Sequence, residues 1–167
     1  MQKLTTFSIV LLLSIFYSQA QTINVNPTGA PESAMTLEQL IQDVFLGSSC
    51  ATVTNITTQS FSNVEYMDAS FNTVNGQKSF AYFTHAGANF PIERGVILSN
   101  GAATVSQGPN NIDGFSGSDG TGASPSTVWP GDADMKTILD GRFGDNQATN
   151  NATVVEFDFV PLDNNFS

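Results

Sequence analysis

The chain has few of the residues on which most catalytic and metal sites depend. Its 167 residues include one Cys, one His and one Trp. A single Cys excludes an internal disulfide framework and a zinc site built from several cysteines. A single His excludes a His-rich metal centre. No GxSxG, HExxH or P-loop motif occurs, so neither His85 nor Cys50 belongs to a recognised catalytic signature.

Basic residues are also scarce. Five Lys and Arg stand against 15 Asp and Glu, which gives a formal net charge of −10 and a pI near 4.1. Because nucleic-acid binding needs clustered positive charge, this balance excludes it. Only 12% of the residues are charged whereas 40% are hydrophobic, and this composition is not typical of disorder. We therefore expect a folded domain with a real core.

The N-terminus has the three-part pattern of a secretory signal peptide. Lys3 supplies positive charge, Phe7–Tyr17 is apolar, and the small residues Ser18 and Ala20 precede Gln21. The apolar run is well short of the roughly 20 residues that span a bilayer. We predict that residues 1–20 are removed and that the mature chain, without a transmembrane helix, is secreted or held at the outer cell surface.

The next segments predict an extended lead-in and one helix. Pro27, Gly29 and Pro31 make residues 21–35 an extended lead-in. Thr36 and Gln39 then match a capping box. An apolar stripe at helical spacing predicts an amphipathic helix over 37–46 that packs on a sheet. The stripe comprises Leu37, Leu40, Ile41, Val44 and Phe45.

Beyond Cys50 the pattern is that of strands. β-Branched or alternating segments predict strands at 50–57, 79–83, 95–99 and 154–160. The last of these places Val155, Phe157 and Phe159 toward the core, with Glu156 and Asp158 on the opposite face. With one solid helix, a parallel βαβ fold is disfavoured. We expect a mostly β domain, an antiparallel sandwich or jelly roll, over 36–167. A sandwich usually needs about seven strands. Because the sequence predicts only the four strands above, we expect this domain to be truncated at its C-terminus.

A long polar stretch at 100–131 precedes a short helix predicted to begin at Asp132. A loop of this length is functional or mobile. Carboxylates and Gly-rich backbone could together supply oxygen ligands for Ca²⁺, and Asp132 and Asp134 are the favoured pair. Asp113 and Asp119 belong to the same set. The alternative is that these aspartates are turn and cap residues.

Several segments, in order, resemble the choice-of-anchor L domain of exported Bacteroidota surface proteins. They are LIQDVFLGSSC, the strand Val53–Thr57, Tyr82-Phe83, NFPIERGVILSNG, Gly108-Pro109-Asn110, GDAD at Gly131, and ATVVEFDFVP. The resemblance covers about residues 37–167, and the family pattern continues beyond FDFVP. It implies a large multidomain surface protein, often with a type IX secretion signal, and no established enzymatic activity.

These features favour a non-catalytic extracellular module that serves adhesion or surface display, with an unidentified protein or glycan ligand. The alternative is a secreted carbohydrate-binding or glycoside-hydrolase domain. In that case Trp129 and Tyr82 would stack on sugars, although Trp129 could instead anchor its loop to the core. Cys50 is either a buried thiol or half of a disulfide with a partner beyond Ser167. His85 is expected to be a polar residue just after a strand.

Overall fold

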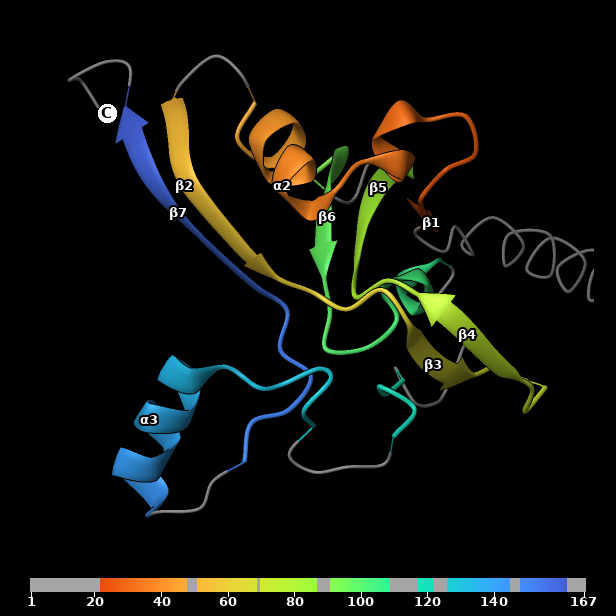
Figure 1. Cartoon of the computed structure of the whole chain (residues 1–167). Coiled ribbons are helices and arrows are strands. Elements are labelled where there is room, and N and C mark those ends of the chain that lie inside the picture. Colours follow the sequence, from red (N-terminus) through yellow and green to blue (C-terminus); the bar gives the residue numbers. More distant parts are fainter. Residues whose placement is uncertain are drawn as a thin grey trace, which may run out of the picture.

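The computed structural model describes residues 22–47, 51–68, 70–86, 91–108, 117–121, 126–144 and 148–161. The predicted signal peptide and Cys50 lie outside these residues. The described strands are β1 (Thr22–Val25), β2 (Ala51–Gln59), β3 (Val64–Met67), β4 (Thr73–Gln77), β5 (Phe80–Ala86), β6 (Arg94–Leu98) and β7 (Val154–Pro161). The helical segments are η2 (Pro31–Ala34), α2 (Leu37–Gln39), η3 (Leu40–Phe45), η4 (Ala103–Ser106) and α3 (Ala133–Phe143), as Figure 1 shows.

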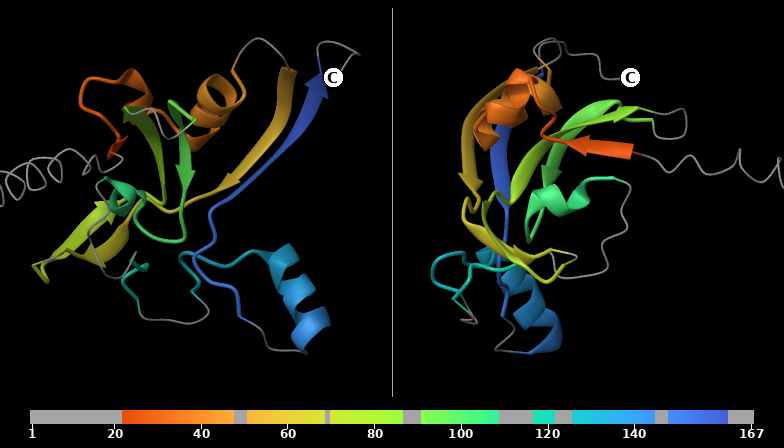
Figure 2. Two further views of the ribbon diagram at one scale, coloured as in Figure 1. Left: turned by 180° about the vertical axis from the view of Figure 1, so that it is seen from behind. Right: turned by 90° about the vertical axis from the view of Figure 1, so that its right-hand side faces the viewer.

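All pairs among the described strands are antiparallel, so the prediction of a mostly β, antiparallel fold is confirmed. The strands form three ladders, in the orders β1-β5-β6, β2-β7 and β3-β4. The four predicted strands correspond to β2, β5, β6 and β7. His85 lies within β5, opposite Ile23 of β1, rather than after the strand as expected. The ladders β1-β5-β6 and β2-β7 lie on either side of α2 and η3 (Figure 2).

The lead-in does more than connect the N-terminus to the first helix. Its first residues form β1, which pairs with β5 from Thr22 opposite Ala86 to Val25 opposite Phe83. Asn26 follows with a φ of 47°, and its side-chain oxygen accepts a hydrogen bond from the Tyr82 backbone N–H at 3.1 Å. This left-handed residue, a conformation that Asn tolerates, ends β1 while keeping it attached to β5.

The predicted helix is present, but its second half is wider than an α-helix. The capping box at Thr36 and Gln39 forms as expected. The turns at Leu40–Phe45 are π-helical, and the Leu46 N–H donates to the Ile41 carbonyl at 3.1 Å. A π turn holds more residues than an α turn, which moves the apolar stripe around the axis. Phe45 is 62% exposed, so its assignment to the buried stripe is wrong.

The main core lies between this helix and both neighbouring ladders. Leu37, Leu40 and Ile41 pack with Phe80 and Tyr82 of β5. On the other side, β7 contributes two partly buried side chains, Val155 and Phe157. The third residue of the predicted inward face, Phe159, is 47% exposed. Its prediction as a core residue is wrong, because Phe159 is not among the side chains that pack on the main core.

A second cluster organises the described parts of the long polar stretch. Trp129 is 1% exposed and packs with Val64 and Ala102. Its ring also stacks on Phe61, with centroids 5.1 Å apart and planes at 17°. Such an aromatic pair contributes beyond simple area burial. Trp129 therefore anchors its loop to the core, which was the alternative to its role as a sugar-stacking residue.

Helix α3 is present but begins at Ala133, one residue after the predicted start at Asp132, which is its N-cap. It projects below the β2-β7 pair (Figure 1). None of its residues is buried, and Met135, Ile138 and Phe143 are 49%, 62% and 65% exposed. Asp132 and the ion pair between Lys136 and Asp140 stabilise it locally. Its position is set by its N-terminal end rather than by a packed face.

Candidate functional site

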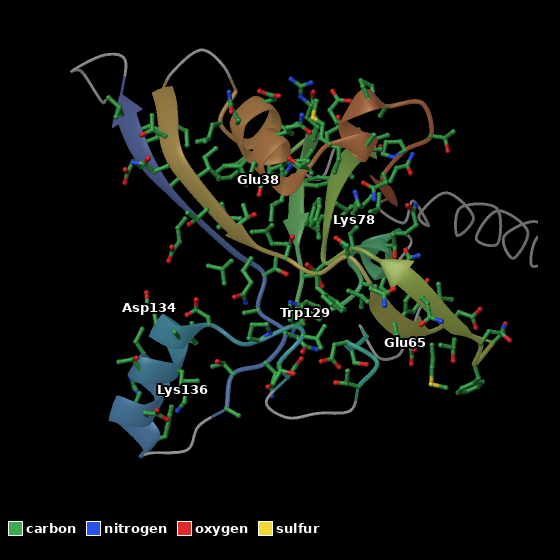
Figure 3. The ribbon with its side chains drawn as sticks, viewed as in Figure 1. Glu38, Glu65, Lys78, Trp129, Asp134 and Lys136 are labelled. Carbon is green, nitrogen blue, oxygen red and sulfur yellow. The ribbon has the colours of Figure 1, made fainter. Side chains whose placement is uncertain are left out.

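An open groove of about 330 Å³ lies where the lower half of the β2-β7 pair meets the N-terminus of α3. Its walls come from three segments far apart in sequence, which are the end of β2, the start of β7 and the start of α3. The lining residues are Thr57, Thr58, Gln59, Gly131, Asp132, Ala133, Asp134, Val154 and Glu156. Figure 3 shows Asp134 at the upper end of α3, on the side toward the β2-β7 pair. Three carboxylates thus share one groove.

Asp132 and Asp134 supply the helical wall of this acidic groove. The Asp132 side chain caps α3 by accepting a hydrogen bond from the Met135 backbone N–H. Its backbone carbonyl accepts from the Lys136 N–H and the Thr149 hydroxyl, both at 3.0 Å. Asp134 is exposed in the first turn, where the helix dipole favours negative charge. Asp132 therefore has a structural role, whereas Asp134 is available to a ligand.

The strand wall carries the third carboxylate and continues as an acidic stripe. Glu156 accepts a hydrogen bond from the Thr57 hydroxyl at 3.3 Å. One step further along β7, Asp158 accepts from the Asn55 side-chain amide at 2.5 Å. Asn55 adopts a φ of 53° at the point where the β2-β7 register shifts. This bulge, a usual way of re-aiming a side chain, brings a neutral donor to Asp158.

Gln59, which lines the acidic groove, also belongs to a polar clamp. The Gln59 side-chain amide donates to the carbonyl oxygens of Pro130 and Ala152, each at 3.0 Å. The Trp129 indole N–H donates to the same Ala152 oxygen at 3.0 Å. Opposite Pro130, Asn150 forms an antiparallel bridge. These bonds fix the entry to α3 against the β2-β7 pair, so they set the position of Asp132 and Asp134.

The sequence prediction of calcium at Asp132 and Asp134 stays a prediction. The structure places both in the acidic groove and adds Glu156, a residue that no local signal connects with them. Among the described residues, no three His, Cys, Asp or Glu side chains are grouped as a metal site. Asp113 lies outside the described residues, and Asp119 lies in a different loop.

Asp119 is a turn residue held by its own loop. It is 9% exposed, and its carboxylate accepts hydrogen bonds from the Ser126 hydroxyl and from the backbone N–H and hydroxyl of Thr121. These bonds, led by that of Ser126, hold the pKa of Asp119 below its ordinary value. The alternative interpretation, a turn aspartate, accounts for this residue.

A second, apolar groove of about 540 Å³ adjoins the first, between the end of β6 and the start of β7. Two of its lining residues are bonded to each other, since the Thr153 hydroxyl donates to the Ser99 carbonyl at 2.7 Å. The lining residues are Leu98, Ser99, Asn100, Asp132, Met135, Ala152, Thr153, Val154 and Val155. Asp132 and Val154 line both grooves, so the acidic groove and this apolar groove form one continuous region beside β7.

The two proposed sugar-stacking aromatics do not reach the surface. Trp129 and Tyr82 are 1% and 4% exposed, and each packs in a different cluster. A sugar-binding platform presents an aromatic face to solvent, so the assignment of these two side chains as stacking residues is wrong. Their burial removes the specific support for a carbohydrate-active domain.

The fold and site define an acidic, antiparallel β module whose grooves lie beside an edge strand. Residues 24–167 match the family model of the choice-of-anchor L domain, and the chain belongs to this family. The family is one of surface-associated modules. No curated protein and no solved structure matches the chain. Within the described residues, no helix is long and apolar enough to cross a membrane.

Proposed function

We propose that the chain is a non-catalytic extracellular module of an exported protein, which serves adhesion or display at the cell surface. The observation that carries the proposal is membership of the choice-of-anchor L family over residues 24–167. Two features support it. The N-terminal sequence has the pattern of a signal peptide, and the candidate sugar-stacking aromatics are buried.

Export is tested by fusing a reporter that is active only outside the cytoplasm to the C-terminus of the chain. The intact chain is expected to give reporter activity and a first residue of Gln21 in the exported product. The variant Leu11→Arg/Leu12→Arg, which interrupts the apolar run with charge, should lose export. Equal reporter activity from both chains, or export with residues 1–20 retained, would contradict this part of the proposal.

The surface role is tested with the purified chain coupled to beads. We expect the beads to adhere to extracellular-matrix or cell-surface preparations, and we expect no release of reducing sugar when the free chain is incubated with polysaccharides. Beads coupled to the heat-unfolded chain are the matched control. Release of reducing sugar that increases with the concentration of the purified chain would favour the hydrolase alternative. Failure of the folded chain to adhere more than the unfolded chain would count against adhesion.

A further inference from the structure

The sequence contains two Asn-Gly pairs, Asn75-Gly76 and Asn100-Gly101. In such a pair the backbone nitrogen of the glycine can attack the Cγ carbon of the asparagine, which expels ammonia and closes a cyclic imide. Water then opens the imide to aspartate or isoaspartate. Glycine favours this reaction because it has no Cβ to hinder the approach of its nitrogen. Both pairs belong to the described residues, and the fold surrounds them differently.

The fold protects the pair Asn100-Gly101. This pair follows β6, and Gly101 is buried. The Gly101 backbone N–H donates a hydrogen bond to the Ser99 hydroxyl at 3.0 Å. The glycine nitrogen must give up its proton before it attacks. Both the hydrogen bond and the burial oppose this step, because a charged nitrogen that is cut off from water is costly.

The pair Asn75-Gly76 has the opposite surroundings. It belongs to β4, and both of its residues are exposed. Gly76 has a φ of 73°, and a Cβ added to it would meet no atom within 4 Å. The space around this glycine is therefore open, and water reaches both the attacking nitrogen and the side-chain amide.

The pairing of β3 with β4 explains why this part of β4 is loosely held. The register shifts at Glu65, so that Asn75 and Gly76 together oppose this one residue. The Glu65 backbone is already bonded to Ser118, through its N–H at 2.9 Å and its carbonyl at 2.8 Å. A bulge of this kind interrupts the ladder and leaves an extra residue unpaired. The reacting pair thus lies at the bulge, where the ladder restrains it least.

We propose that Asn75 is a site of spontaneous deamidation and that the fold directs this reaction to Asn75 rather than to Asn100. The Gly76 nitrogen gives its proton to solvent and bonds to the Asn75 Cγ. The bond from Cγ to the side-chain nitrogen breaks, and the leaving group takes a proton from solvent and departs as ammonia. Water that attacks Cγ then gives aspartate, whereas water that attacks the backbone carbonyl carbon gives isoaspartate.

The two products change the β3-β4 hairpin differently. Aspartate adds a negative charge but keeps the backbone as it is. Isoaspartate also adds a carbon atom to the backbone of β4, which displaces the residues that follow from their register. The first of these with a pairing partner is Gln77, which lies opposite Val64 of the cluster around Trp129. Isoaspartate at position 75 should therefore loosen β4. This inference does not depend on a surface role.

The test follows the purified chain in mildly alkaline buffer at body temperature. Samples are digested, and peptide mass spectrometry measures the exchange of an amide for a carboxylate at each asparagine. Synthetic peptides with aspartate or isoaspartate at position 75 identify the two products. We expect Asn75 to convert about tenfold faster than Asn100, because the Gly101 N–H must first lose its hydrogen bond. Conversion of Asn100 as fast as that of Asn75 would overturn the proposal.

The same measurement on the chain unfolded in guanidinium chloride separates the effect of the fold from that of the local sequence. The two pairs should then convert at similar rates, and the ratio seen in the folded chain would overturn the role given to the fold. Asn75→Gln should abolish conversion in β4, since glutamine would have to close a larger ring, and the matched control Asn100→Gln should leave it unchanged.

Two further measurements test the physical reasons. Ser99→Ala removes the acceptor of the Gly101 N–H and should speed conversion of Asn100; an unchanged rate would overturn the protecting role of Ser99. Amide hydrogen exchange in residues 73–77 should be faster in the isoaspartate fraction than in Asn75→Asp, which has the charge without the added backbone atom. Equal exchange in the two would overturn the predicted loosening of β4.

Discussion

The Ala152 carbonyl oxygen offers a sharp test of how the acidic groove is held together. It accepts two hydrogen bonds at 3.0 Å, one from the Trp129 indole and one from the Gln59 amide. Removing either donor leaves the other in place, so neither single change creates a buried acceptor without a partner. Removing both does, and an unsatisfied acceptor costs more than the net value of one hydrogen bond.

The magnitudes follow from these contacts. Trp129→Phe keeps an aromatic ring beside Phe61 but loses the indole donor and some packing, for about 1–2 kcal/mol. Gln59→Met keeps the side-chain length but loses the donor to Pro130 and Ala152, for about 1–2 kcal/mol. The double variant should lose roughly 1 kcal/mol more than the sum of the two. This excess is at the lower end of the usual penalty because Ala152 is only partly buried.

Urea unfolding of the four chains, followed by tryptophan-independent far-ultraviolet circular dichroism, gives the free energies of unfolding. The control is Trp129→Phe combined with Lys136→Gln, a change in the exposed ion pair of α3, and these two should be additive within about 0.5 kcal/mol. Additivity of the Trp129 and Gln59 changes to the same precision would refute the reasoning, since it would mean that the carbonyl regains a partner from solvent.

Three further predictions concern β7, Asp119 and calcium. Phe157→Ala should cost about 3 kcal/mol of unfolding free energy and Phe159→Ala about 1, because only Phe157 packs on the main core; equal losses in urea unfolding would contradict this burial. The lowered pKa of Asp119 stabilises the fold above the ordinary aspartate pKa, and this contribution is lost as the pH falls through the lowered value. Asp119→Asn should therefore destabilise the chain at pH 7 and flatten the fall in stability below about pH 5, and parallel pH profiles would show that Asp119 contributes nothing. Calorimetric titration should detect Ca²⁺ binding near millimolar concentration that Asp132→Asn/Asp134→Asn weakens, and no binding, or the same binding by the variant, would leave both residues as cap and first-turn residues.

Local sequence predicts those parts of the fold that depend on neighbouring residues. The capping box needs only Thr36 and Gln39, three residues apart, and it forms as predicted. The N-terminus of α3 likewise follows from Asp132 and the residues directly after it. The alternating apolar and acidic residues of 154–160 are sufficient to indicate a strand. The short strands β1, β3 and β4 were not predicted. For β3 and β4, the local signal that could have found them is the turn between the two strands. In this turn Asp68 accepts hydrogen bonds from the backbone N–H groups of Ser70 and Asn72.

Tertiary structure decided which of these residues meet, because pairing between distant segments leaves little trace in a single sequence. Asp132 and Asp134 follow from the sequence as a local pair, but Glu156 joins them only through the pairing of β2 with β7. Phe157 and Phe159 have the same periodicity, yet Phe157 packs on the main core whereas Phe159 is 47% exposed, because contacts with distant segments decide burial. Sequence by itself thus determined the acidic charge, the β-rich character and the caps, which are properties of composition and short spacing. The grooves and the burial of Trp129 and Tyr82 were decided by packing, because contacts between distant residues set them.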